Sequence, residues 1–278
     1  SNERRTSERT TFIQEEIYSS LTRLFPTNEM GLILGMMIGE TRDIYKETKE
    51  NFKTSGITHL IAVSGSNVAF IVLLVQLVLK KIIGKRNTYF ISIIFLNIFM
   101  LVSGASSSVI RATIMTTLSI VADILYLKSD AISNLETSAF VLLVLNPLIV
   151  YDVGFILSFG GTIGILSLSK DFQCVFKKTG RLKETLAVTC SAQIVLLPIM
   201  AYYFNNISLI SLITNILVVP ISGIVTIMGF IVFFISKISF PFAQILAKSL
   251  YILAMFIIKV AEFFSKFSFS TSFAKTNE

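Results

Sequence analysis

The residues best suited to chemistry lie in one short stretch, HLIAVSGSNV, from His59 to Val68. It holds the only histidine of the chain and a Ser-Gly-Ser-Asn break at the start of a long apolar run. In hydrocarbon an unsatisfied backbone group costs several kcal/mol, so a membrane-grade segment does not carry such a break without a reason. The break either opens the helix toward a polar substrate or forms a tight packing contact. The candidate site residues here are His59, Ser64, Gly65, Ser66 and Asn67.

His59 itself has two interpretations. As an ionisable group within a membrane segment it is a candidate pore-mouth or relay residue, and as a polar side chain at an interface it is a cap. A lone histidine is a poor metal site, because zinc takes three or four ligands and the sequence has no Cys/His cluster. Ser64 lies about 140° away on a continuous helix, so the two residues do not form a hydrolase pair. We therefore expect no enzyme activity, no metal and no cofactor.

Arg111 is the strongest single candidate. It lies a few residues inside an apolar segment, with Ser107 and Ser108 about one turn before it on the same face. A buried arginine costs about 2.5–3.5 kcal/mol on insertion scales, so it needs a partner. Asp123 is about three turns further along the helix and is too far. Arg111 either pairs with Asp152, which would hold two helices together, or presents its planar guanidinium to passing phosphates.

Prolines and glycines mark further breaks. Pro198, Pro220 and Gly223 are expected to interrupt helices. Pro220 falls in the middle of an apolar run at 207–236 that is longer than one span requires, so this run either kinks or forms two half-helices. Asn215 and Pro220 are added to the candidate residues of a polar path for this reason.

Composition determines the environment that must hold these residues. Of the 278 residues, 53% are hydrophobic and 15% are charged, and the mean hydropathy is +0.76. Soluble domains carry about 25% charged residues, so a water-soluble fold is excluded. The net charge of +7 fits either a nucleic-acid partner or the usual enrichment of Lys and Arg in cytoplasmic loops.

The elements predicted from this pattern are helices. We expect an all-α fold, a polytopic transmembrane helical bundle with broken or re-entrant helices, because several apolar segments are short or interrupted. Residues 1–56 form an amphipathic, interfacial N-terminal region, and residues 57–278 form the transmembrane domain. The predicted spans are Ile57–Leu79, Tyr89–Ser103, Val109–Leu127, Ala139–Val150, Val153–Ser169, Thr185–Phe204, Ile207–Ser236 and Phe242–Phe264.

Two basic clusters set the expected orientation. One follows the first span, at Lys80–Arg86, and the other follows the fifth, at Lys170–Lys183. Both are expected on the cytoplasmic side, and the four crossings between them are consistent with this. The His59 end of the first span then faces outward.

Several of these motifs resemble, in order, those of the ComEC-type competence protein family. HLIAVSGSNV is similar to the HLxAVSGxxV element of that family. Five further elements extend the resemblance over residues 31–223. They are GLILGMMIGETRDI from Gly31, SGASSSVIRA from Ser103, DVGFILSF from Asp152, LLPIMAYYF from Leu196 and NILVVPISG from Asn215.

The resemblance implies a channel that passes single-stranded DNA through the cytoplasmic membrane during natural transformation. Its partners would be DNA, the lipid bilayer, a DNA receptor outside, and a separate motor or DNA-processing proteins inside; the oligomeric state stays open. The alternative is a transporter or channel for small solutes or ions, because such proteins also use broken helices with a few charges.

The sequence also departs from the family pattern. Family members commonly carry histidine at the position of Asn67, proline at that of Ser107 and glutamine at that of Ile156. A mechanism that needs two histidines is therefore not expected here. The extracytoplasmic oligonucleotide-binding-type domain and the metallo-β-lactamase-like domain of full-length relatives are missing, so the chain resembles the channel core of a longer protein.

Overall fold

The computed structural model describes residues 2–61, 63, 65–175, 181–204, 206–207, 211–266 and 271–272, and these are almost entirely helical. The only strands in these ranges are two residues each and pair antiparallel, β1 (Asn206–Ile207) with β2 (Thr271–Ser272). The α-helices are α1 (Asn2–Thr22), α2 (Thr27–Ile38), α3 (Lys46–Thr54), α4 (Gly65–Ile83), α5 (Lys85–Val102), α6 (Ser107–Ile124), α7 (Ala131–Leu145), α8 (Val153–Val175), α9 (Arg181–Phe204), α10 (Ser211–Ile238) and α11 (Phe240–Ser265).

Five of these helices are long and apolar enough to cross a membrane. Most of their side chains are not buried against the rest of the chain, as expected of helices that face lipid. The protein is a multi-pass membrane protein, and the predicted all-α class is confirmed. The five segments are Lys85–Val102, Ser107–Ile124, Val153–Cys174, Ile213–Ile238 and Phe240–Ser265.

Two predicted boundaries were wrong. The first span does not begin at Ile57, because Thr58–Leu60 form a separate 3₁₀ turn and α4 begins only at Gly65. The segment predicted at 139–150 belongs to α7, which ends at Leu145, and to a 3₁₀ turn at Pro147–Tyr151. Proline disfavours helical geometry in the residue before it, and this ends α7 before Pro147.

The prediction that prolines interrupt the later helices was also wrong. Pro198 lies inside α9, and Pro220 lies inside α10, which runs unbroken for 28 residues. In membrane helices neighbouring helices and local adjustments satisfy the carbonyl that loses its donor. Gly223 serves close packing instead, because a Cβ there would lie 2.3 Å from the ring of Phe70 on α4.

The N-terminal helices pack as their sequence patterns indicate. α1 is amphipathic, with Ile17 and Leu21 buried and Phe12 exposed. α2 is too short to span a membrane, and its residues Met30–Ile38 are all buried in the core. The division at residue 56 stays a prediction.

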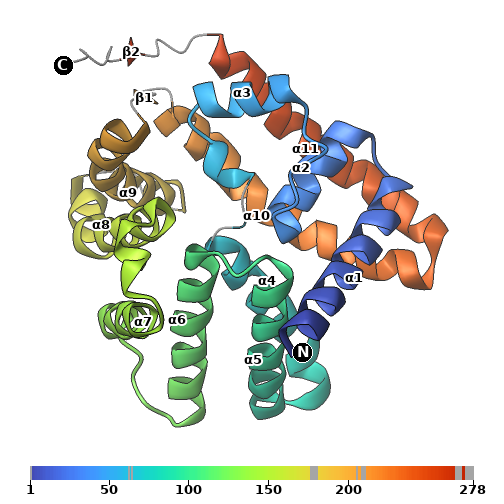
Figure 1. The fold of residues 1–278 in the computed structure, drawn as a ribbon, viewed down its shortest axis with the longest axis horizontal. Helices are drawn as coiled ribbons and strands as arrows, with labels where there is room; N and C mark the ends of the chain where they lie inside the picture. The colour runs from blue at the N-terminus through green and yellow to red at the C-terminus, as the bar shows by residue number, and fades with distance from the viewer. Residues whose placement is uncertain are drawn as a thin grey trace.

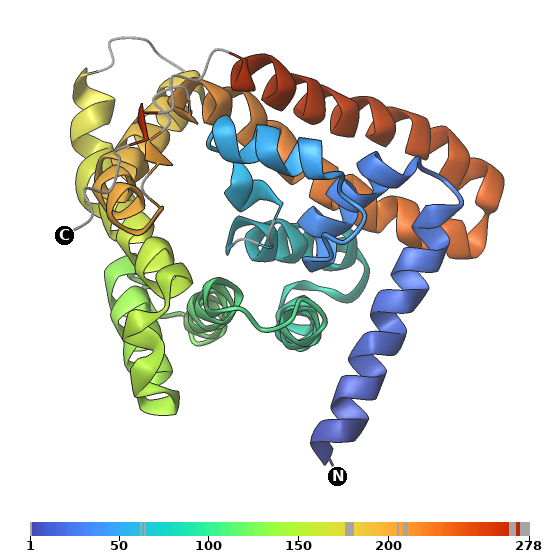
Figure 2. The ribbon, with the colours of Figure 1, turned by 45° about the horizontal axis from the view of Figure 1, so that its top comes forward.

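The helices surround two separate hydrophobic clusters. The larger joins α1–α6, α10 and α11, and the smaller joins α6, α7 and α8. α6 lies between the clusters and contributes Val109 and Ala112 to the larger, Ile110 and Ile114 to the smaller. Figure 1 shows α7, α8 and α9 gathered on one side of α6, and Figure 2 shows α10 and α11 running side by side on the other.

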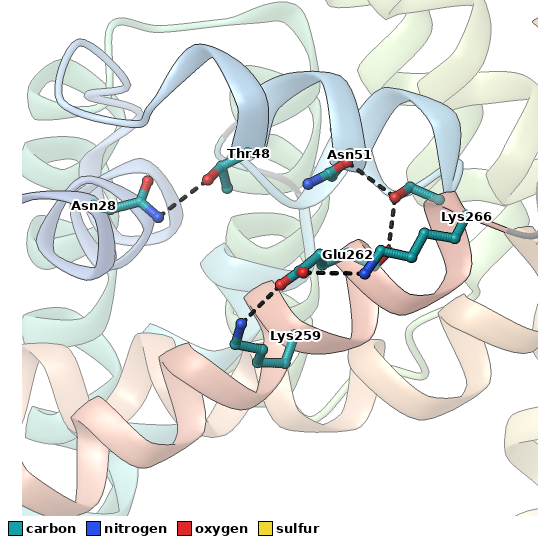
Figure 3. A network of polar contacts seen from close by, with 7 residues as sticks. Asn28, Thr48, Asn51, Lys259, Glu262 and Lys266 are labelled. Carbon is teal, nitrogen blue, oxygen red and sulfur yellow. Dashed lines mark hydrogen bonds and ion pairs between the residues drawn. The ribbon is translucent and has the colours of Figure 1, made fainter.

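The charged segment that precedes α4 is fixed onto the end of α11 (Figure 3). The Ser265 hydroxyl donates to Asn51 Oδ1 of α3 at 2.9 Å, and Asn28 of α2 donates to Thr48 Oγ1 of α3 at 3.1 Å. Phe52 of α3 is fully buried beneath this polar layer. These contacts place the 3₁₀ turn that carries His59.

Candidate functional site

Arg111 lies at the junction of α4, α6 and α8, with only 9% of its surface exposed. Its Nε donates to Ser158 Oγ at 2.7 Å, and its Nη1 donates to Thr162 Oγ1 at 2.9 Å and to the Met115 sulfur at 3.4 Å. The guanidinium also lies 5.6 Å from the centroid of the Phe159 ring. The buried cation is therefore held by neutral acceptors and by the face of an aromatic ring.

Of the two roles considered for Arg111, the structure does not form the ion pair with Asp152. Among the described residues, no carboxylate lies within ion-pair distance of the guanidinium. Asp152 Oδ1 accepts instead from the Phe155 backbone N–H at 2.7 Å and from the Ser107 hydroxyl at 3.1 Å. Asp152 directly precedes α8 in extended geometry, so its carboxylate caps the first turn of that helix, where the helix dipole favours negative charge.

Gly65, at the start of α4, lies against the free side of the guanidinium. A Cβ on Gly65 would be 2.9 Å from Arg111 Nη2 and 3.3 Å from the Ala112 Cβ. The sequence break and the arginine therefore form one site, which could not be read from their separation of 46 residues. Ser108 completes it, since its hydroxyl accepts from Ser158 Oγ at 3.3 Å.

The other residues of the break have different positions. The Asn67 amide is buried and donates to the Met36 carbonyl at 2.7 Å, which ties α4 to the end of α2. Asn67 is thus in part a packing residue, which agrees with the second interpretation of the break, a tight packing contact. Ser64 and the side chain of Ser66 lie outside the described residues.

His59 sits on the 3₁₀ turn that leads to the break. Its side chain is accessible to solvent, yet crowding by protein desolvates the imidazole and lowers its pKa to about 4. Burial penalises the charged form, so at neutral pH His59 is an uncharged donor and acceptor. Of the two residues, Arg111 is therefore the one that is charged at neutral pH.

The structure does not bring Asn215 and Pro220 to this site. Asn215 is buried in α10, and its Oδ1 has no hydrogen-bond partner among the described residues. Pro220 is exposed, one turn before the Gly223 contact with Phe70. No described contact links either residue to Arg111.

Sequence reasoning missed Ser158, Thr162, Phe159 and Met115. Ser158 and Thr162 lie four residues apart, on one face of α8, so the spacing was a usable signal once α8 was paired with α6. In the described part of the chain no three His, Cys, Asp or Glu side chains are grouped so as to hold a metal ion.

Comparisons with known proteins agree with the motif order. The model of the competence protein family matches residues 36–276. ComE operon protein 3 of Bacillus subtilis (strain 168) is 27% identical over 209 residues, which are 75% of this chain and 26% of that protein. An uncharacterized protein of Aquifex aeolicus (strain VF5) is 25% identical over 236 residues, 84% of this chain and 54% of that protein.

The chain thus spans about a quarter of the first relative and about half of the second. No solved structure matches it. The family match covers most of the chain, including the break, the Arg111 segment and the start of α8. The chain belongs to the competence protein family.

Proposed function

We propose that this chain is the membrane path by which single-stranded DNA crosses the cytoplasmic membrane during natural transformation. Membership of the competence protein family supports a role in DNA uptake, and the helices long enough to span a membrane support a path across it. The name of the Bacillus subtilis relative, ComE operon protein 3, points to the same process.

One observation carries the choice of a polyanion as substrate, namely a buried arginine without a carboxylate. Nη2 of Arg111 faces Gly65 and has no hydrogen-bond partner among the described residues. Membrane charges usually pair with one another, so an arginine held by hydroxyls, a thioether sulfur and an aromatic ring, without a carboxylate, keeps its charge for a ligand. Its planar fork suits phosphate oxygens.

The surroundings of Arg111 suit passage rather than tight binding. Ser107, Ser108, Ser158 and Thr162 offer neutral hydroxyls, and conduction requires contacts that are weak and repeated. In this proposal the chain is a conduit and not an enzyme. A DNA receptor outside, and a motor or DNA-processing proteins inside, would deliver and pull the strand.

The test is substitution of Arg111 in the full-length gene of a naturally transformable host. Arg111→Gln keeps donors and acceptors for Ser158 and Thr162 and removes the buried charge, so the protein should accumulate normally. Loss of a charge-assisted contact worth about 1.5–3 kcal/mol should lower transformation about tenfold or more. Arg111→Lys should keep part of the activity, because it retains the charge without the fork.

Gly65 provides the steric arm of the same test. Gly65→Leu would push the guanidinium aside and fill the space beside it, whereas Gly65→Ala adds one methyl, which meets the end of the Arg111 side chain and the Ala112 Cβ. Transformation should fall far more for the leucine variant, while DNA still reaches the outer side of the membrane. Normal transformation by Arg111→Gln, with loss of growth on a particular solute, would instead support a small-solute transporter.

A further inference from the structure

A surface groove lies between the end of α1 and the first half of α11. Arg23, Leu24 and Pro26 line one side, and residues 241–252 of α11 line the other, around a space of about 630 Å³. Figure 2 shows these two segments side by side, at the end of the α10–α11 pair. The volume is in the range of about 300–1,000 Å³ that small-molecule sites occupy.

The groove contains two cations, Arg23 and Lys248, for which the described residues provide no carboxylate. The other lysines at the ends of α10 and α11 are all paired. Lys237 contacts Glu16 at 2.8 Å, Lys259 contacts Glu262 at 2.8 Å, and Lys266 contacts Glu262 at 3.4 Å. Lys248 therefore differs from these neighbouring lysines in having no carboxylate partner, and together with Arg23 it favours an anionic occupant.

The α11 wall of the groove is apolar around Lys248. Ile245 and Ile252, three residues before and four after it on the same helix face, are 64% and 65% exposed. Lys248 lies eight residues into a helix long enough to span a membrane, about 12 Å from its start. Lys248 therefore lies within the apolar part of this helix, and its long stem would allow the amine to reach the headgroup level of a bilayer.

We propose that this groove binds an anionic phospholipid, with the headgroup phosphate between Arg23 and Lys248 and an acyl chain along Ile245 and Ile252. Charge complementarity identifies the headgroup, and the exposed isoleucines identify the chain. A nucleic acid fits less well, because strand binding uses stacked aromatic rings, and Tyr251 is the only aromatic among the described residues that line the groove. The proposal does not depend on the path at Arg111.

The test uses the full protein in nanodiscs made of phosphatidylcholine alone or with one-third phosphatidylglycerol. Thermal unfolding should shift upward with phosphatidylglycerol for the wild type and for Lys248→Arg. The double variant R23Q/K248Q should lose most of this difference. Lys80→Gln is the matched control, since Lys80 is an exposed lysine without a carboxylate partner among the described residues, lies in the last turn of the apolar helix α4 and is outside the groove. This variant should keep the difference.

Two further arms separate the sources of phosphate. Soluble glycerol phosphate should give no shift in phosphatidylcholine nanodiscs, because it has no acyl chain. An equal phosphatidylglycerol shift in the wild type and in R23Q/K248Q would overturn the proposal, and so would displacement of the lipid by a short single-stranded oligonucleotide. If the double variant fails to accumulate, the single variants Arg23→Gln and Lys248→Gln take its place in the comparison with the wild type. The co-purified lipid is then measured by mass spectrometry for each of these proteins as well.

Discussion

Arg111 is stabilised by neutral groups, and this changes what should be expected of its neighbours. If Asp152 neutralised the arginine, then loss of either partner would leave an unpaired buried charge. In the structure Asp152 caps α8 and leaves Arg111 to Ser158 and Thr162. Substitutions at Asp152 and Arg111 should therefore act independently.

Asp152 gives a prediction that separates a helix cap from an ion pair. Asparagine caps helices about as well as aspartate, so Asp152→Asn should leave stability nearly unchanged, whereas Asp152→Ala should cost about 1 kcal/mol. Thermal unfolding of the purified protein measures both. Asp152→Asn should not rescue any defect of Arg111→Ala. Rescue would instead indicate that the two side chains form an ion pair, which the geometry argues against.

His59 gives a pH prediction. Crowding lowers its pKa from 6.5 to about 4 in the folded protein, so between these values the unfolded chain binds more protons than the folded one. The contribution of neutral His59 to the free energy of unfolding is therefore fully present above pH 6.5, and it is lost as the pH falls toward 4.

Melting temperatures of the wild type and His59→Gln, followed from pH 7.5 down to pH 4.5, test this directly. Other groups titrate in both proteins, so the difference between the two curves isolates His59. The wild type should lose more stability on acidification. Parallel curves would mean that the imidazole is fully hydrated.

At the scale of elements, glycines allow α8 and α9 to pack closely. A Cβ on Gly164 would lie 2.6 Å from the Ser191 carbonyl oxygen, which is backbone and cannot move aside. On Gly161 it would meet only the Leu196 side chain, at 3.4 Å. The spacing from Gly160 to Gly164 is the small-xxx-small pattern of membrane helix pairs.

The two glycines therefore predict opposite effects of one substitution. Gly164→Ala should destabilise the α8–α9 pair by about 1–3 kcal/mol through overpacking. Gly161→Ala should be neutral or stabilising, because alanine favours a helix over glycine by up to about 1 kcal/mol. Thermal unfolding and cellular abundance measure both variants. Equal behaviour would mean that the helices separate easily.

Composition and apolar runs were sufficient to predict the helices, but not their ends or their partners. Apolar periodicity does not report a 3₁₀ turn, so the first span was started at Ile57 instead of Gly65. Pro220 was read as a break, whereas α10 continues through it, as membrane helices are able to do. Likewise an ion pair with Asp152 was one of the two roles considered for Arg111, since sequence shows charges but not the hydroxyls that a neighbouring helix supplies.

At the scale of the whole molecule, a polar seam runs between α6 and α8, beside the smaller hydrophobic cluster that these two helices share. The seam is formed by the contacts of Ser107 with Asp152, Ser108 with Ser158, and Arg111 with Ser158 and Thr162. Apolar cores resist separation because they bury surface, whereas hydroxyl contacts can exchange with water or phosphate at little net cost. If DNA passes beside Arg111, α8 and α6 should separate along this seam.

Covalent closure of the seam tests that expectation. In a background with Cys174 and Cys190 replaced by Ser, Ser108→Cys with Ser158→Cys joins α6 to α8 at hydroxyls that lie 3.3 Å apart. Ser119→Cys with Ser129→Cys is the matched control, since these hydroxyls lie 3.2 Å apart on one side of the seam.

Oxidation should lower transformation at least tenfold for the first pair and leave transformation by the second pair unchanged. Reductant should restore transformation by the first pair. Since each reduced protein is its own reference, the lost serine hydroxyls do not confound the comparison. Undiminished transformation with a fully formed α6–α8 crosslink would mean that the strand crosses elsewhere.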